Sequence, residues 1–241
     1  MTLVAASAWP RPASGYRPFD STDAAVAAKG EIEIELGPVG WKRLGTQQSL
    51  IVPAFILNWG FADRLEAVLE GKQYVLLGQD VVGPRYRLED AALSLKYVLR
   101  EGGLQGREGI SIATEIGALL PTVNGDSGMG AQGVLIVSQR WQAITVHLNG
   151  QFVWSRAHEP GGFGGLILEG PDAWPVRPAA EIFVEGERGS PTTRSALLGG
   201  IWRVRDWLSF DLGARGARVG GHDVAEIRLG LTWAFALGAG G

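Results

Sequence analysis

The sequence of 241 residues contains no cysteine, only two methionines and only three histidines. Without cysteine, the chain has neither a disulfide framework nor a thiolate metal site. Its net charge is −3 and it has no basic cluster, which argues against a nucleic-acid partner. It also has no run of about 18 uncharged apolar residues, so a transmembrane helix is excluded.

Helical periodicity is missing as well, since no stretch after residue 30 repeats its apolar residues with a period near 3.6. Glycine is abundant instead, with 36 residues, and it favours turns and close backbone packing over helices. Residues 1–29 combine prolines with an alanine-rich run, which predicts a flexible N-terminal segment. Its first eight residues end in small side chains, so a signal-peptide remnant and a plain leader are alternatives there. Residues 1–29 as a whole are alternatively a plug inserted into the fold.

The clearest positive signal is a strict alternation over residues 225–235. Ile227 and Leu229 fall on one face of such a strand, and Glu226 and Arg228 fall on the other, because successive side chains point to opposite faces. A strand of roughly 9–11 residues, tilted near 45°, spans a bilayer core. The stretch therefore has the length and pattern of a membrane-spanning strand.

Eleven further stretches with strand-like patterns precede it, so the chain is predicted to contain about twelve strands. They cover 31–36, 49–57, 64–70, 90–100, 110–118, 133–138, 144–154, 164–169, 180–187, 194–202 and 208–215. We expect an all-β protein, a transmembrane antiparallel β-barrel over residues 30–235 with a short C-terminal tail at 236–241. A soluble β-sandwich also explains alternation, but its strands are usually about 5–6 residues long.

The predicted connections tend to alternate between short and long, as in outer-membrane barrels with short periplasmic turns and longer external loops. An even strand number then places both chain ends on the periplasmic side. Tryptophans mark the short turns, which is typical of an aromatic girdle at a membrane interface. The predicted interface aromatics are Trp59, Trp141, Trp174, Trp207, Trp233 and Phe235.

The polar faces of the strands predict a charged lumen. Fixed charges there either tune the selectivity of a channel or pair into a plug, because isolated buried ions are costly. The candidate channel-lining residues are Glu31, Glu33, Glu35, Arg64, Glu66, Glu70, Lys96, Arg100, Glu115, His147, Asn149, Glu181, Glu185, Asp211, Arg215, Glu226 and Arg228.

Five segments, taken in order, resemble one protein family: 17–25, 30–37, 59–66, 90–97 and 229–235. Together they are similar to the MetA-pathway of phenol degradation family, whose members are often described as outer-membrane transporters. The resemblance implies a β-barrel in the outer membrane of a Gram-negative bacterium, with a role in the uptake of hydrophobic or aromatic compounds. It supplies no catalytic residues.

The preferred function is therefore passive transport of small solutes, hydrophobic or aromatic compounds among them. We expect the protein not to be an enzyme and to have no cofactor or metal. The expected partners are outer-membrane lipid, a small-molecule solute and the barrel assembly machinery. One alternative is a structural or adhesion-type barrel without transport. Another is an outer-membrane lipid hydrolase that uses His147. Such an enzyme needs a serine beside the histidine on the lipid-facing surface. Here the next residue on the same face of the strand is Asn149 instead of serine, and His147 is predicted to face the lumen.

Overall fold

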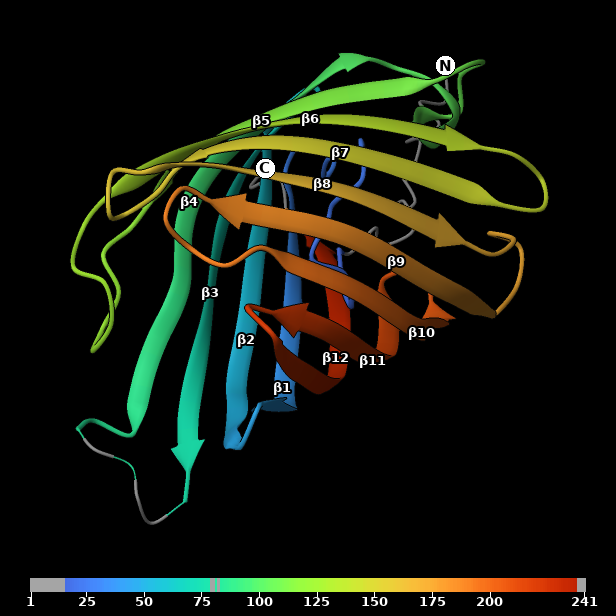
Figure 1. Ribbon diagram of the computed structural model, residues 1–241. Helices are drawn as coiled ribbons and strands as arrows, with labels where there is room; N and C mark the ends of the chain where they lie inside the picture. Colours follow the sequence, from blue (N-terminus) through green and yellow to red (C-terminus); the bar gives the residue numbers. More distant parts are fainter. Residues whose placement is uncertain (1–15, 79–80, 82, 238–241) are drawn as a thin grey trace, which may run out of the picture.

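The computed structural model describes residues 16–78, 81 and 83–237, whose strands form one closed antiparallel barrel (Figure 1). Each strand pairs with the next in sequence, and β12 pairs with β1 to close the ring. The strands are β1 (Glu31–Leu44), β2 (Gln47–Ala62), β3 (Leu65–Leu77), β4 (Tyr86–Arg100), β5 (Ser111–Leu119), β6 (Gly130–Arg140), β7 (Thr145–Trp154), β8 (Pro160–Glu169), β9 (Val176–Glu187), β10 (Thr193–Arg205), β11 (Leu208–Val219) and β12 (His222–Ala236). The predicted twelve-stranded barrel is confirmed, and the sandwich alternative is wrong. The predictions for residues 1–15 and 238–241 lie outside the described residues.

The strands are long enough to cross a bilayer, from 9 residues in β5 to 16 in β2. The two faces of the wall differ in polarity. On β11, Leu212 is 54% exposed on the outer face, whereas Asp211 beside it is 6% exposed on the inner face. A soluble barrel would bury its apolar side chains, and this one turns them outward and its charges inward. This is the arrangement of a transmembrane β-barrel, which is the architecture of bacterial outer-membrane proteins.

No helix in the described ranges has the length and hydropathy needed to cross a membrane.

The predicted interface aromatics gather at one end of the barrel, where β1 begins and β12 ends. We call this the near end and the opposite one the far end. Five of the six are substantially exposed, and Phe235 is half-buried against Trp233, with 5.4 Å between ring centroids. Trp202, which the sequence prediction omitted, is also exposed close to the near end, where it pairs with Val176. Their role at a membrane interface remains a prediction.

The first hairpin is longer than the alternation predicted. β1 continues to Leu44, well beyond the predicted end at Leu36, because a bulge between Leu36 and Val39 shifts its register against β12 and interrupts the alternation. β2 in turn runs to Ala62. The gap left between the predicted strands 49–57 and 64–70 is therefore wrong as a turn, since most of it belongs to β2.

The predicted alternation of short and long connections holds only in part. At the far end, the connections 45–46 and 220–221 are tight turns, although that end was expected to carry the longer loops. At the near end, the connection 101–110 is long, and it contributes Gln105, whose side-chain amide donates to the Ala24 carbonyl at 2.8 Å. Through Gln105, this near-end connection reaches chain that lies inside the barrel.

The outward apolar face gives a direct test of the membrane assignment. Leu198 lies near the middle of β10 and is 70% exposed. We expect Leu198→Arg to destabilise the barrel folded in a bilayer by about 2–4 kcal/mol, because an arginine is costly near the bilayer midplane. Val176→Arg, at the start of β9, is the matched control and should cost no more than about 1 kcal/mol near the interface. Urea titrations in lipid vesicles measure both, and equal costs would contradict the depth assignment.

Candidate functional site in the barrel lumen

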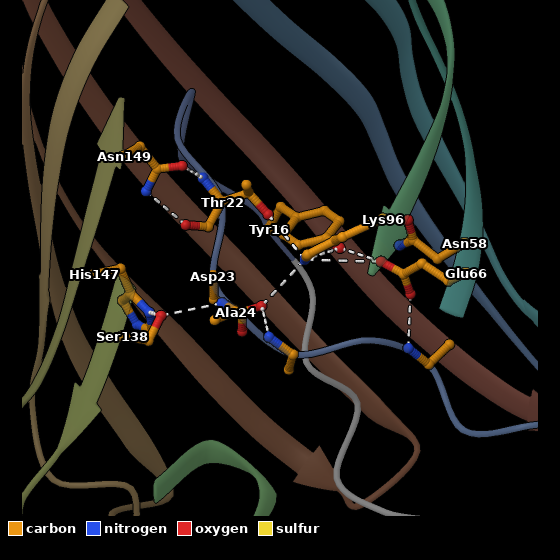
Figure 2. A network of polar contacts seen from close by, with 12 residues as sticks. Tyr16, Thr22, Asp23, Ala24, Asn58, Glu66, Lys96, Ser138, His147 and Asn149 are labelled. Carbon is orange, nitrogen blue, oxygen red and sulfur yellow. Dashed lines mark hydrogen bonds and ion pairs between the residues drawn. The ribbon is translucent and has the colours of Figure 1, made fainter. Parts of the chain in front are cut away.

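Residues 16–30, which we call the lumen segment, run inside the ring of strands, drawn in blue in Figure 1. The segment forms no strand, so its backbone N–H groups need other acceptors. Side chains of the wall provide them. Glu181 accepts from the N–H groups of Asp20 and Ser21, at 3.0 and 2.6 Å, and Asn149 accepts from Thr22 at 3.0 Å. Figure 2 shows the Asn149 contacts, in which the side-chain amide also donates to the Thr22 carbonyl at 2.7 Å.

Further along, the segment is held in the same way. The Ala24 N–H donates to the Ser138 hydroxyl at 3.0 Å (Figure 2). The Ala27 N–H donates to the Glu66 carboxylate at 2.6 Å. Glycines in the wall make room for this path. A Cβ built on Gly60 would collide with the backbone of the segment at residues 27 and 28. The inner wall is therefore fitted to the lumen segment in both polarity and shape.

A buried cluster around Lys96 fixes the beginning of the segment (Figure 2). The Lys96 ammonium lies over the Tyr16 ring at 4.1 Å from its centroid and donates to the Tyr16 hydroxyl, which in turn donates to Glu66. Its Nζ also lies 3.5 Å from an Asp23 oxygen and 3.7 Å from a Glu66 oxygen. The side chain of Lys96 is fully buried, so these groups supply the compensation that its charge requires.

A second charge cluster holds Asp20 against β11 and β12. Arg228 contacts Asp20 at 2.8 Å and Glu226 at 2.6 Å, and Arg215 contacts Glu226 at 2.8 Å. Nearby, Nε of Arg17 lies 3.4 Å from Asp211. Much of the predicted lumen charge is thus paired within the wall or with the lumen segment, which is the plug interpretation that the sequence left open.

The residues that the structure describes line two sizeable cavities in the lumen. The near cavity, of about 930 Å³, is lined by residues 25–31 of the segment and by near-end side chains. The far cavity, of about 190 Å³, lies on the other side of the segment, and its lining includes Glu70, Lys72 and Glu115. Tyr16 lines both cavities. A solute passing from one cavity to the other therefore meets the lumen segment at Tyr16.

Most of the predicted lumen residues fall into two groups. Those that bond directly to the lumen segment are Glu31, Glu35, Glu66, Lys96, Asn149, Glu181, Asp211, Arg215 and Arg228. The second group lines a cavity and consists of Glu33, Glu70, Glu115 and Glu226. Arg64 stands exposed in the turn between β2 and β3 at the rim of the near cavity, with its guanidinium over the Tyr97 ring.

Arg100 and Glu185 differ from the prediction, because they are exposed near the ends of β4 and β9 and line neither cavity. The alternation gave the correct face for Glu185 but not the depth at which the lumen ends. Sequence reasoning also missed Tyr16, Asp20 and Lys72. The first two lie in a segment without periodicity, and Lys72 follows a bulge in β3 that hides its orientation.

The hydrolase alternative depends on the surroundings of His147. Its Nδ1 is 2.8 Å from the Ser138 hydroxyl, and its Nε2 is 3.5 Å from Glu169. Ser138 nevertheless faces the lumen, is completely buried and already accepts from Ala24. A lipid hydrolase needs its serine on the lipid-facing surface, so this geometry favours a structural hydrogen-bond network. Within the described part of the chain, no group of three or more His, Cys, Asp or Glu residues is placed to hold a metal ion.

A closed twelve-stranded wall with an apolar outer face and a polar lumen defines a small outer-membrane β-barrel. Among solved structures, an outer membrane channel from Pseudomonas putida F1 has a TM-score of 0.60, with 11% identity over 90% of this chain and 98% of that one. The KdgM porin in complex with disordered oligogalacturonate has a TM-score of 0.53, with 13% identity over 84% and 99% of the two chains. The CymD monoaromatic hydrocarbon channel has a TM-score of 0.50, with 10% identity over 87% and 89%. These likenesses show the fold, while no family model and no curated protein matches the chain.

Proposed function

We propose that this protein is a passive channel of the bacterial outer membrane for small solutes, aromatic compounds among them. The observation that carries the proposal is a transmembrane barrel whose polar lumen holds two cavities, one on each side of the lumen segment. The small outer-membrane channels with the same fold support it, the monoaromatic hydrocarbon channel included. Membership of the MetA-pathway of phenol degradation family is part of the proposal and rests on the sequence resemblance. Outer-membrane lipid and the barrel assembly machinery are the proposed partners.

The test is single-channel conductance in a planar bilayer, with solute flux measured by liposome swelling. We expect discrete but small conductance from the intact protein, because the lumen segment leaves only a restricted path past Tyr16. Heat-modifiable gel migration should confirm that the barrel is folded. A folded barrel that carries neither ions nor solutes, with or without residues 2–29, would contradict the proposal and favour a structural barrel.

A further inference from the structure

The far cavity has an excess of negative charge. Its lining carries five carboxylates and three cationic side chains. The cations are engaged within the barrel: Lys72 lies 3.4 Å from Asp90 and 3.8 Å from Asp20, Arg228 pairs with Asp20, and Arg17 pairs with Asp211. Arg228 and Lys72 thus engage Asp20, Asp90 and Glu226, and the two carboxyl groups of the lining that are left over are Glu70 and Glu115.

Neither of these two glutamates has a hydrogen bond or ion pair with another described residue. Glu115 is only 7% exposed and lines the far cavity. Lys96 is its cross-strand neighbour, yet the Lys96 ammonium is directed to Tyr16, Asp23 and Glu66 instead. A buried carboxylate without a partner is costly, so this position favours a cationic ligand that would supply the missing charge.

The neutral polar groups of the cavity also leave acceptors unmatched. The side-chain amide of Gln151 donates to the Gln132 carbonyl oxygen at 2.9 Å, and the amide of Gln132 donates to the Ser94 hydroxyl at 3.4 Å. Both glutamines thus use their amide groups as donors within the wall. What the cavity offers a ligand is mainly carboxylate and carbonyl oxygen, which suits a group with several N–H donors.

Much of the remaining lining is apolar and includes Phe55, Phe163, Ile51 and Val134. A cavity of about 150 Å³ with apolar walls is large enough for a benzene ring. The far cavity, at about 190 Å³, therefore has room for one ring with a short substituent. Its apolar walls favour the ring, and its unpaired carboxylates favour a positively charged substituent.

We propose that the far cavity binds a small organic ammonium ion, with its charged nitrogen at Glu70 and Glu115 and its apolar or aromatic body against Phe55 and Phe163. The inference rests on the proposed function, since it names the class of solute that the lumen would select. It adds a charge requirement to a channel for small aromatic compounds. The site lies on the far-end side of the lumen segment. A solute entering from the far end would therefore meet this site before it passes Tyr16 into the near cavity.

The test is isothermal titration calorimetry on the full-length barrel in detergent, with benzylammonium as the probe and benzyl alcohol and benzoate as its neutral and anionic counterparts. We expect benzylammonium to bind at least tenfold more tightly than either. The double variant Glu70→Gln and Glu115→Gln should lose at least tenfold in benzylammonium affinity. Glu185→Gln, which removes an exposed carboxylate outside both cavities, should bind as the unchanged protein does.

Folding of each variant is checked by heat-modifiable migration, and Glu115→Gln alone serves as the second variant if the double variant does not fold. Absence of benzylammonium binding to the unchanged protein would overturn the proposal. So would equal affinity for benzyl alcohol, or affinity unchanged by the substitutions. Binding in detergent requires no ion flow, so its failure is distinguishable from failure of the channel function, which is measured by conductance.

Discussion

Deletion of residues 2–29 is expected to raise the single-channel conductance several-fold. The part of this stretch that the structure describes lies in the lumen, and Tyr16 borders both the far and the near cavity. Removing it would join the two cavities into one path. It would also free Glu181, Asn149 and Ser138 from the backbone groups that they now bind, so that these side chains could hold water instead. Planar-bilayer recordings of the deleted and intact proteins measure the change.

A cross-linked variant is the matched control for this deletion. A Cβ built on Gly165 would meet the Ser21 hydroxyl, so Ser21→Cys and Gly165→Cys place two sulfur atoms within reach of each other. The chain has no cysteine of its own, so this pair forms the only disulfide. We expect the oxidised variant to conduct no more than the intact protein and the reduced one to match it. Unchanged conductance after the deletion would show that the lumen segment is not the barrier.

The barrel itself could be predicted from the sequence because alternation records which face of a strand is polar. The glutamates of β1 are the clearest case. Glu31, Glu33 and Glu35 alternate with apolar residues, and all three are buried on the inner face. The pattern fails where the backbone departs from a regular strand. The bulges near Val39 in β1 and Lys72 in β3 shift the face of the residues that follow, and no local signal in the sequence marks the size of that shift.

The path of the lumen segment could not be predicted in the same way. The sequence offered a plug as one alternative, but the contacts that define it join residues far apart in the chain, such as Tyr16 with Lys96 and Ser21 with Glu181. Alternation shows that a charge faces the lumen and does not identify its partner. A pairing of this kind depends on strand register and tilt, which only the folded barrel establishes.

Substitution of Lys96 by methionine is expected to cost about 3–5 kcal/mol of folding free energy, because breaking a buried ion pair leaves an uncompensated charge. The side chain is fully buried, and without its ammonium Glu66 would lose its cationic partner while Asp23 would lose a contact at 3.5 Å. The Tyr16 hydroxyl would lose a neighbour as well. Urea unfolding in lipid vesicles, followed by tryptophan fluorescence, measures the loss.

Two comparisons separate this electrostatic cause from a loss of packing. Lys42→Met removes a partly exposed lysine whose ammonium lies 5.1 Å from the Tyr74 ring centroid, and it should cost no more than about 1 kcal/mol. Adding Glu66→Gln to Lys96→Met should restore part of the stability, because it removes the carboxylate left without a partner. A double variant as unstable as Lys96→Met alone would mean that Lys96 acts mainly through its packing against Tyr16. Recovery would show that charge pairing between Lys96 of β4 and Glu66 of β3 stabilises the wall of the barrel. The lumen segment is bound at this same pair, because Tyr16 contacts both residues and the Ala27 N–H donates to Glu66.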